Sequence, residues 1–382
     1  MVLKWTPPRP VERRLHEAGL RGDRHAQLQV LAAEELFIGQ ARHEVDAEPD
    51  LIRWPAVVDP ATGGLCRPLL TRGMLPPWRP DWVFHEVTLA WVADFRWTEA
   101  GQWLAVNSGT PAAVHLPASS RDRDVWRRYY AENARSAPKR LSALHTGPLY
   151  GPLAFGLACG GHLAVTNGVP WNEVGTVYRA YGTQRRVLRE AWGITGHDGW
   201  QERVGALLAR SDSPPEPEFA LRVRTRLVES LGKPPTAELW RETAAATLRD
   251  RGAPAPVVKE MEDLVRRITR YEARFRADGL LSDDGRVTSV CAYDYGRAPS
   301  VARWGLAARF CTPHQAECAI VRAGALSRTA YRSWEDFSAG YVLGRVLRFD
   351  EEEYGRYYDD ALSSHRLLVQ DEGSPWRHLP WS

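Results

Sequence analysis

The chain has 382 residues, of which 25% are charged and 44% are hydrophobic, so it is long enough to form two globular domains. Its formal net charge of +3 is too small to indicate binding to nucleic acid or to an anionic membrane surface. The sixteen tryptophans are an unusual number and indicate large aromatic contributions to cores or interfaces.

The cysteines and the apolar runs indicate the cellular compartment of the protein. The five cysteines are scattered, and none belongs to a close Cys-x-x-Cys pair of the zinc-binding type. We therefore expect five unpaired, reduced thiols, with no metal and no cofactor. The polar N-terminal segment lacks the apolar core of a signal peptide, and no apolar run reaches the roughly 18 residues of a membrane-spanning helix. These patterns predict a cytoplasmic protein that does not contact the membrane.

The first 120 residues predict a small α/β module. Residues 24–38 have apolar positions at helical spacing, and residues 103–107 form an apolar strand that a turn at 108–111 closes. A second short strand is expected at 113–116, whereas residues 82–87 fit either a strand or a short helix. Strands mixed with one or two helices favour a small α/β module that ends near residue 120.

Two segments of this module carry a resemblance to a known family. They are the end of the predicted helix, LAAEELFI at 31–38, and the strand with its turn, LAVNSGTP at 104–111. Residues 24–117 resemble the N-terminal module of SseB-type proteins, known from enhanced serine sensitivity and secretion-associated sequences. That family tends to continue its strand with Asn-Pro-Gly-Ser-Pro, and the present chain lacks the first of these prolines.

From residue 121 the pattern changes to helices. The Pro-rich segment 211–217 between two of them is interpreted as a surface loop. The predicted fold class is α+β, with a small α/β module over residues 1–120 and a larger, mostly α-helical domain over residues 121–382. Before residue 290 the expected helices are 126–134, 152–165, 173–191, 198–209, 218–230, 237–250 and 256–276.

The run from residue 292 to residue 349 predicts three consecutive helices that organise this domain. Thr312, Pro313 and Gln315 form a capping box with proline at the first helical position, and Ser333 begins the third helix in the same way. The third helix is apolar on two sides, which is typical of a buried helix. Gly340 and Gly344, four residues apart, predict that another element crosses it closely.

Three short motifs in this part carry a second resemblance: AWGI at 191–194, YDYGR at 293–297, and SWEDF at 333–337 continuing into YVLGR at 341–345. Residues 152–381 resemble the bacterial family catalogued as domain of unknown function 1266 (DUF1266). Where that family usually has Trp-Asp, this chain has Tyr293-Asp294. The resemblance implies a helical fold and no known chemistry.

Six residues of this region are candidate binding residues. Asp294 and Arg297 are three apart on one helix and can pair, and Arg345 of the third helix can approach them. A carboxylate between two guanidiniums forms either a pocket for an anionic ligand or, as we favour, a structural ion network. Trp304, Trp334 and Tyr341 fit core positions better than a stacking platform. The Pro/Trp-rich C-terminal end at 374–381 is either a docking tail or folds back onto the core.

No Gly-rich phosphate loop, catalytic triad or metal-ligand cluster is present in the sequence. We therefore expect a bacterial protein-interaction or regulatory module, linked to secretion or conflict systems, whose partner is another protein. The alternative is an enzyme or binder for an anionic small molecule that uses Asp294, Arg297 and Arg345. Binding of nucleic acid through residues 121–140 requires a one-sided basic face, and the interleaved acidic residues make it the least favoured hypothesis.

Overall fold

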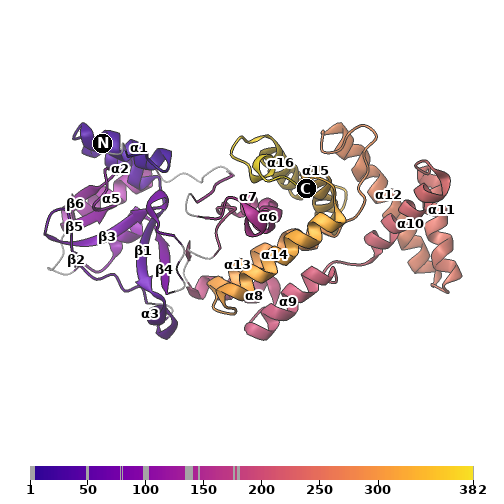
Figure 1. Ribbon diagram of the computed structural model, residues 1–382, viewed down its shortest axis with the longest axis horizontal. Coiled ribbons are helices and arrows are strands. Elements are labelled where there is room, and N and C mark those ends of the chain that lie inside the picture. Colours follow the sequence, from indigo (N-terminus) through magenta and orange to yellow (C-terminus); the bar gives the residue numbers. More distant parts are fainter. Residues whose placement is uncertain are drawn as a thin grey trace. The chain divides into compact units, whose positions relative to one another are not determined.

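The computed structural model describes most of the chain (Figure 1). Its contacts divide the chain into two compact units that are interleaved in sequence. The first comprises Met1–Pro138, Ala143–Gly147 and Glu173–Gly193, and the second Lys139–Ser142, Pro148–Asn172 and Ile194–Ser382. The described residues are 5–48, 51–77, 79, 81–97, 103–133, 141–144, 147–174, 177–178 and 181–381.

The first unit is built on a mixed sheet with strand order β6-β5-β3-β1-β4-β7, and β2 pairs with β3 beside this path. Strands β1 and β4 are antiparallel, whereas β3 and β5 are parallel. The predicted strands at 103–107 and 113–116 are confirmed as β5 and β6. The strands are β1 (Leu36–Ala41), β2 (Val57–Val58), β3 (Leu65–Thr71), β4 (Trp82–Val87), β5 (Trp103–Val106), β6 (Val114–Pro117) and β7 (Val177–Tyr178).

The two faces of this sheet bury different side chains, as the period-two alternation of a strand requires. Leu36 and Ile38 of β1 join a large apolar cluster with residues of the helices, including Leu31 and Trp126. Phe37, between them, belongs to a smaller cluster. The described helices of this unit are α1 (Pro10–Leu20), α2 (Arg24–Ala32), α3 (Arg42–Ala47), α4 (Leu89–Asp94), α5 (Ser120–Asn133) and α8 (Tyr181–Trp192).

Three expectations for this unit are corrected. The helix predicted over 24–38 ends at Ala32, and residues 36–41 form a central strand, because pairing with β4 along the whole of β1 overrides the helical spacing. Within the helix predicted over 173–191, residues 177–178 form β7 and the helix starts only at Tyr181. The unit also includes α1, which the polar N-terminal sequence did not predict, and α5, which lies beyond residue 120.

The second unit is helical, and most of its predicted helices are confirmed. The helix predicted at 237–250 has these bounds, and the three predicted helices of 292–349 are present with the Thr312–Gln315 capping box. The single helix predicted at 152–165 is instead two, which meet at Gly160. The helices are α6 (Gly151–Cys159), α7 (Gly161–Asn167), α9 (His197–Ala209), α10 (Glu216–Leu231), α11 (Ala237–Asp250), α12 (Ala255–Ala277), α13 (Ala292–Ala307), α14 (Pro313–Ala330), α15 (Trp334–Phe349), α16 (Arg356–Gln370) and α17 (Pro375–His378).

Helix α13 is the most deeply buried element of this unit, since every one of its residues except Trp304 is buried. Helix α15 packs against it, and the burial predicted for this helix is confirmed at Trp334, Phe337 and Tyr341. Gly344 permits this contact, because a Cβ atom there would lie 2.5 Å from the Cβ of Tyr293 on α13.

The cysteines and the helix lengths agree with the sequence. All five cysteines are free, as predicted. None of the helices in the described part of the chain is long and apolar enough to cross a membrane.

Two substitutions in α15 test its packing. Trp334→Ala should lower the free energy of unfolding by about 3–5 kcal/mol, because it removes a large aromatic side chain from a core. Gly344→Leu should also destabilise the chain, although leucine has the higher helix propensity, since the added side chain forces α13 and α15 apart. Urea unfolding followed by circular dichroism measures both changes.

The matched control is Phe349→Ala in the same helix, where the side chain is 42% exposed and about 1 kcal/mol is expected. If the two test variants unfold at the same urea concentration as the parent chain, the burial of α15 is contradicted.

Candidate functional site

The predicted pair Asp294 and Arg297 meets on α13. Arg297 Nη2 lies 2.5 Å from Asp294 Oδ1, at the i,i+3 spacing expected for such a pair. Both residues are buried, with exposed fractions of 1% and 5%. The backbone amide of Ser213 donates to Asp294 Oδ2 at 3.3 Å, and the Ser213 hydroxyl donates to Oδ1. The carboxylate of Asp294 is therefore held from two sides.

A second carboxylate, Asp212, completes the cluster. Arg297 Nη1 lies 2.8 Å from Asp212 Oδ2, Arg203 of α9 binds Oδ1, and Arg348 of α15 lies 3.7 Å from Oδ2. Burial alone would raise the pKa of the Asp212 carboxyl, but the charges of Arg297 and Arg203 outweigh it and hold this pKa below its usual value. We call Asp212, Asp294, Arg203, Arg297 and Arg348 the arginine–aspartate cluster.

Asp212 belongs to the Pro-rich segment 211–217, which was predicted to be a surface loop. Ser211, Pro214, Pro215 and Glu216 are exposed, as that prediction requires, but the side chain of Asp212 turns inward and is only 2% exposed. A short polar residue beside prolines is a common turn signal, so the local sequence gave no indication of a buried charge.

The cluster has the properties of a structural network. Its two carboxylates are engaged by guanidinium groups and by Ser213. A carboxylate that acts as a general base must be able to reach a proton of its substrate, and these two are already occupied. The geometry thus favours the structural interpretation of Asp294 and Arg297 over the anion-binding one.

Arg345 does not join this cluster. We expected Arg345 to be the second guanidinium beside Asp294, but among the described residues no carboxylate lies within ion-pair distance of it. Its guanidinium lies 5.9 Å from the ring centre of Tyr357. Arg348, almost one turn later on α15, approaches Asp212 instead, so α15 does contribute an arginine to the cluster, but it is Arg348 and not Arg345.

The candidate aromatic residues Trp334 and Tyr341 are core residues, whereas Trp304 is half-buried. Trp334 stacks on Trp376, with ring centres 5.2 Å apart and planes 8° apart, and lies edge-on to Trp381 at 4.8 Å. Its indole N–H donates to the carbonyl oxygen of Leu379 at 2.9 Å. The C-terminal end at 374–381 therefore folds back onto the core and is not a free docking tail.

A buried pair of histidines was not predicted. His162 of α7 and His365 of α16 both hydrogen-bond to the Ser338 hydroxyl of α15, at 2.9 and 2.8 Å. The ring of His162 also stacks on Tyr341 with centres 4.2 Å apart. Burial lowers the pKa of His162 far below its usual value and that of His365 to about 4, so both rings are neutral at neutral pH. The one sequence feature that indicated a buried histidine is the apolar run in which His162 lies.

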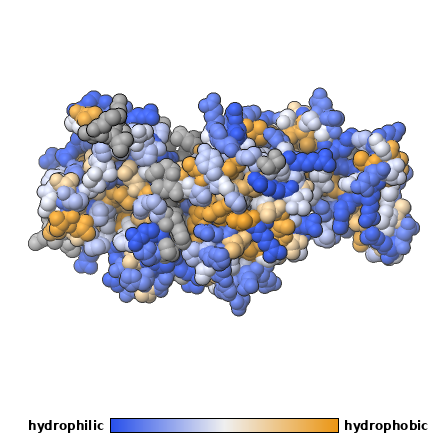
Figure 2. Space-filling model, in the orientation of Figure 1, coloured by the Kyte–Doolittle hydropathy of each residue, from blue (hydrophilic) through white to orange (hydrophobic). Residues whose placement is uncertain are grey.

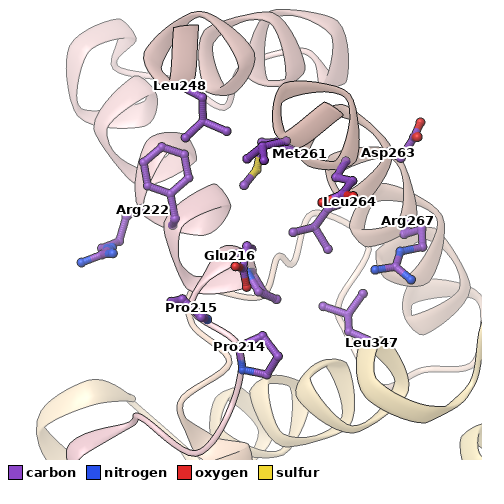
Figure 3. A pocket seen from close by; sticks show the side chains of 14 residues that line it. Pro214, Pro215, Glu216, Arg222, Leu248, Met261, Asp263, Leu264, Arg267 and Leu347 are labelled. Atoms are coloured by element: carbon purple, nitrogen blue, oxygen red, sulfur yellow. The ribbon is translucent and has the colours of Figure 1, made fainter. Parts of the chain in front are cut away.

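An open groove lies between α10, α11, α12 and the end of α15, with the Pro-rich segment along one edge (Figure 3). Its volume is about 820 Å³. On the face seen in Figure 2, the surface over α10–α12 carries scattered hydrophobic side chains among hydrophilic ones. The apolar lining consists of three prolines and aliphatic, aromatic and thioether side chains, including Phe219, Leu248, Val257, Met261, Leu264 and Leu347. The charged lining residues are Glu216, Arg222, Glu260, Asp263 and Arg267.

These lining residues explain the character of the groove. In Figure 3, Met261, Leu264 and Leu347 point toward the hollow, whereas Arg222 and Asp263 point outward from its sides. Val257 is 40% exposed although it is apolar. An apolar floor with a charged rim is the usual anatomy of a site that binds another molecule.

The model of the family described as "Protein of unknown function (DUF1266)" matches residues 187–381, which is more than half of the chain. The chain belongs to the DUF1266 family. The DUF1266 match includes the arginine–aspartate cluster and the groove, and it begins within α8 rather than at the predicted residue 152. No curated protein and no solved structure matches the chain.

No three His, Cys, Asp or Glu side chains of the described residues gather closely enough to hold a metal ion.

Removing one charge from the arginine–aspartate cluster should destabilise the chain strongly. Asp212→Asn keeps the shape of the side chain but leaves the buried guanidinium of Arg297 without this counter-charge, so the free energy of unfolding should fall by about 3–5 kcal/mol. Urea unfolding at pH 7 measures the change. As control, Glu238→Gln removes an acid that is 72% exposed and pairs with Arg241, and should cost less than about 1 kcal/mol. Equal effects of the two changes would contradict a buried network.

The histidine pair predicts how stability depends on pH. Both pKa values are depressed in the folded state, so below about pH 6.5 the unfolded chain binds protons first and folding is disfavoured. The free energy of unfolding should fall by up to about 1.4 kcal/mol per pH unit per histidine between about pH 6.5 and 4. Urea titrations at pH 7, 6 and 5 measure the slope. His365→Gln should reduce it and the exposed His43→Gln should not; an unchanged slope in His365→Gln contradicts the assignment.

Proposed function

We propose that the chain is a regulatory module that binds a partner protein, and that the groove of its DUF1266 region receives a helical segment of that partner. The observation that carries the proposal is the apolar, half-open groove of about 820 Å³ between α10, α11, α12 and α15. Amphipathic helices that dock into apolar grooves are a recurring mode of recognition between proteins.

The dimensions of the groove support a helix as its occupant. A helix about 10 Å across that rises 1.5 Å per residue fills about 120 Å³ per residue, so the groove has room for about two turns. Two turns present apolar side chains at i, i+3, i+4 and i+7 on one face. On the opposing wall, Val257, Met261 and Leu264 of α12 repeat with the same helical spacing and match such a stripe.

The alternative function, binding of or catalysis on an anionic small molecule through Asp294, Arg297 and Arg345, has less support. Asp294 is paired with Arg297, Arg297 is also paired with Asp212, and Arg345 lies near Tyr357 instead. The groove is lined by other residues. This hypothesis would need the arginine–aspartate cluster to open before a ligand could enter.

The cellular setting belongs to the same proposal. Five free cysteines are typical of a reducing compartment and support a place in the cytoplasm. The resemblance of residues 24–117 to SseB-type modules supports a bacterial origin and a link to secretion or conflict systems. In this hypothesis the first unit is a separate module and the DUF1266 region carries the partner-binding groove.

Site-specific photo-crosslinking in cells of the source organism tests the proposal. A photoreactive amino acid at position 257, on the groove, should give one adduct with a defined segment of one protein. The same group at position 231, where the native leucine is 43% exposed but lies outside the groove lining, is the matched control and should give none. Mass spectrometry of the adduct identifies the segment and whether its contacting residues have helical spacing.

A second variant shows whether the adduct depends on the groove itself. Leu248→Glu places a charge in the apolar lining and should abolish crosslinking from position 257. Equal adducts from both positions, an adduct that survives Leu248→Glu, an adduct with a small molecule only, or the absence of any adduct would overturn the proposed function.

A further inference from the structure

A second hollow adjoins the groove and differs from it in character. It has a volume of about 330 Å³ and shares Phe219 and Arg222 with the groove lining. Arg226 of α10 and Arg251 at the end of α11 also line it, and no acidic residue does. Three arginines thus surround one small hollow, and we call them the arginine trio.

The trio is not neutralised within the described chain. No carboxylate among the described residues forms an ion pair with Arg222, Arg226 or Arg251. Their neighbours on the same helices are paired, since Arg241 binds Glu238 and Arg249 binds Glu262. The basic charge of the hollow is therefore free to attract an anion.

Without a bound anion, the repulsion between these arginines destabilises the folded chain. Arg222 and Arg226 are one turn apart on α10, and like charges at this spacing destabilise a helix. Arg251 is held beside them, because its guanidinium lies 5.2 Å from the centre of the Phe219 ring. A carboxylate placed between them would relieve the repulsion.

The other polar groups of the hollow, the hydroxyls of two threonines, are not available to bind an anion. The hydroxyls of Thr243 and Thr247 donate to the carbonyl oxygens of Leu239 and Thr243, each at 2.7 Å. Their protons are thus used within α11, and the guanidinium groups supply the available donors. Arginine is suited to carboxylates because its planar N–H groups can bind both oxygens.

We propose that the arginine trio is a subsite for the carboxylates of the segment that docks in the groove, so that the partner is an acidic amphipathic helix. The inference rests on the proposed function, because Phe219 and Arg222 border both hollows and place the acidic residues within about two turns of the apolar stripe. Glu216 and Glu260 line the groove but not the basic hollow. They therefore fix the orientation of the helix, with its acidic end at the trio.

Selection from a displayed peptide library tests this subsite with the full chain. The library consists of helical peptides with a fixed stripe of leucines at i, i+3, i+4 and i+7 and with random residues elsewhere. Clones are kept only if their binding is lost in Leu248→Glu, which restricts the selection to the groove. The expected result is enrichment of Asp and Glu clustered at one end of the stripe.

Affinity measurements on the selected peptides locate the acidic end. Arg226→Glu changes a residue that lines the hollow but not the groove, and it should weaken binding of an acidic clone about tenfold. Arg322→Glu, an exposed arginine of α14, is the matched control and should change it less than about twofold. Higher salt should weaken binding of the acidic clone to the parent chain more than to Arg226→Glu.

Different outcomes of these experiments would overturn the subsite and the proposed function. Groove-dependent clones without acidic enrichment, or acidic clones that bind Arg226→Glu as well as the parent chain, would overturn the subsite and leave the proposed function standing. A selection that yields no clone sensitive to Leu248→Glu would overturn the groove and the subsite together.

Discussion

The second unit depends on how it neutralises the charge of Arg297. Helix α13 is buried along almost its whole length, so a guanidinium on it has no access to water and requires counter-charges inside the protein. Asp294 supplies one from the same helix and Asp212 the other from the Pro-rich segment. Because Arg203 and Arg348 also bind Asp212, this one charge ties α9, α13, α15 and the edge of the groove into a single arrangement.

Regular patterns allowed much of this fold to be predicted. The capping signals at Thr312 and Ser333 marked helix starts correctly. The glycine spacing predicted close neighbours, which are Tyr293 of α13 at Gly344 and the segments around Ser289 and Tyr331 at Gly340. Such signals act over one or two turns and are visible in the local sequence. The strand at 36–41 was missed because its conformation is decided by pairing with β4, more than 40 residues away.

The candidate site was harder to predict for the same reason. The Asp294–Arg297 pair follows from helical spacing, but Asp212 reaches it from about 80 positions earlier in the chain. His162 and His365 meet at Ser338 from three separate helices. The groove also escaped prediction, because its walls are ordinary amphipathic helices and its concavity results only from how they pack.

The interleaving of the two units constrains how the molecule can be divided. The chain leaves the first unit, contributes short segments to each unit in turn, and returns with residues 173–193, which contain β7 and α8, before the second unit is completed. No single cut in the backbone therefore separates two whole units: a fragment that ends near residue 120 lacks an edge strand of its sheet, and one that begins near residue 194 lacks α6 and α7. Exchange of either unit at one crossover point would meet the same obstacle, because it would leave β7 and α8, or α6 and α7, with the wrong unit.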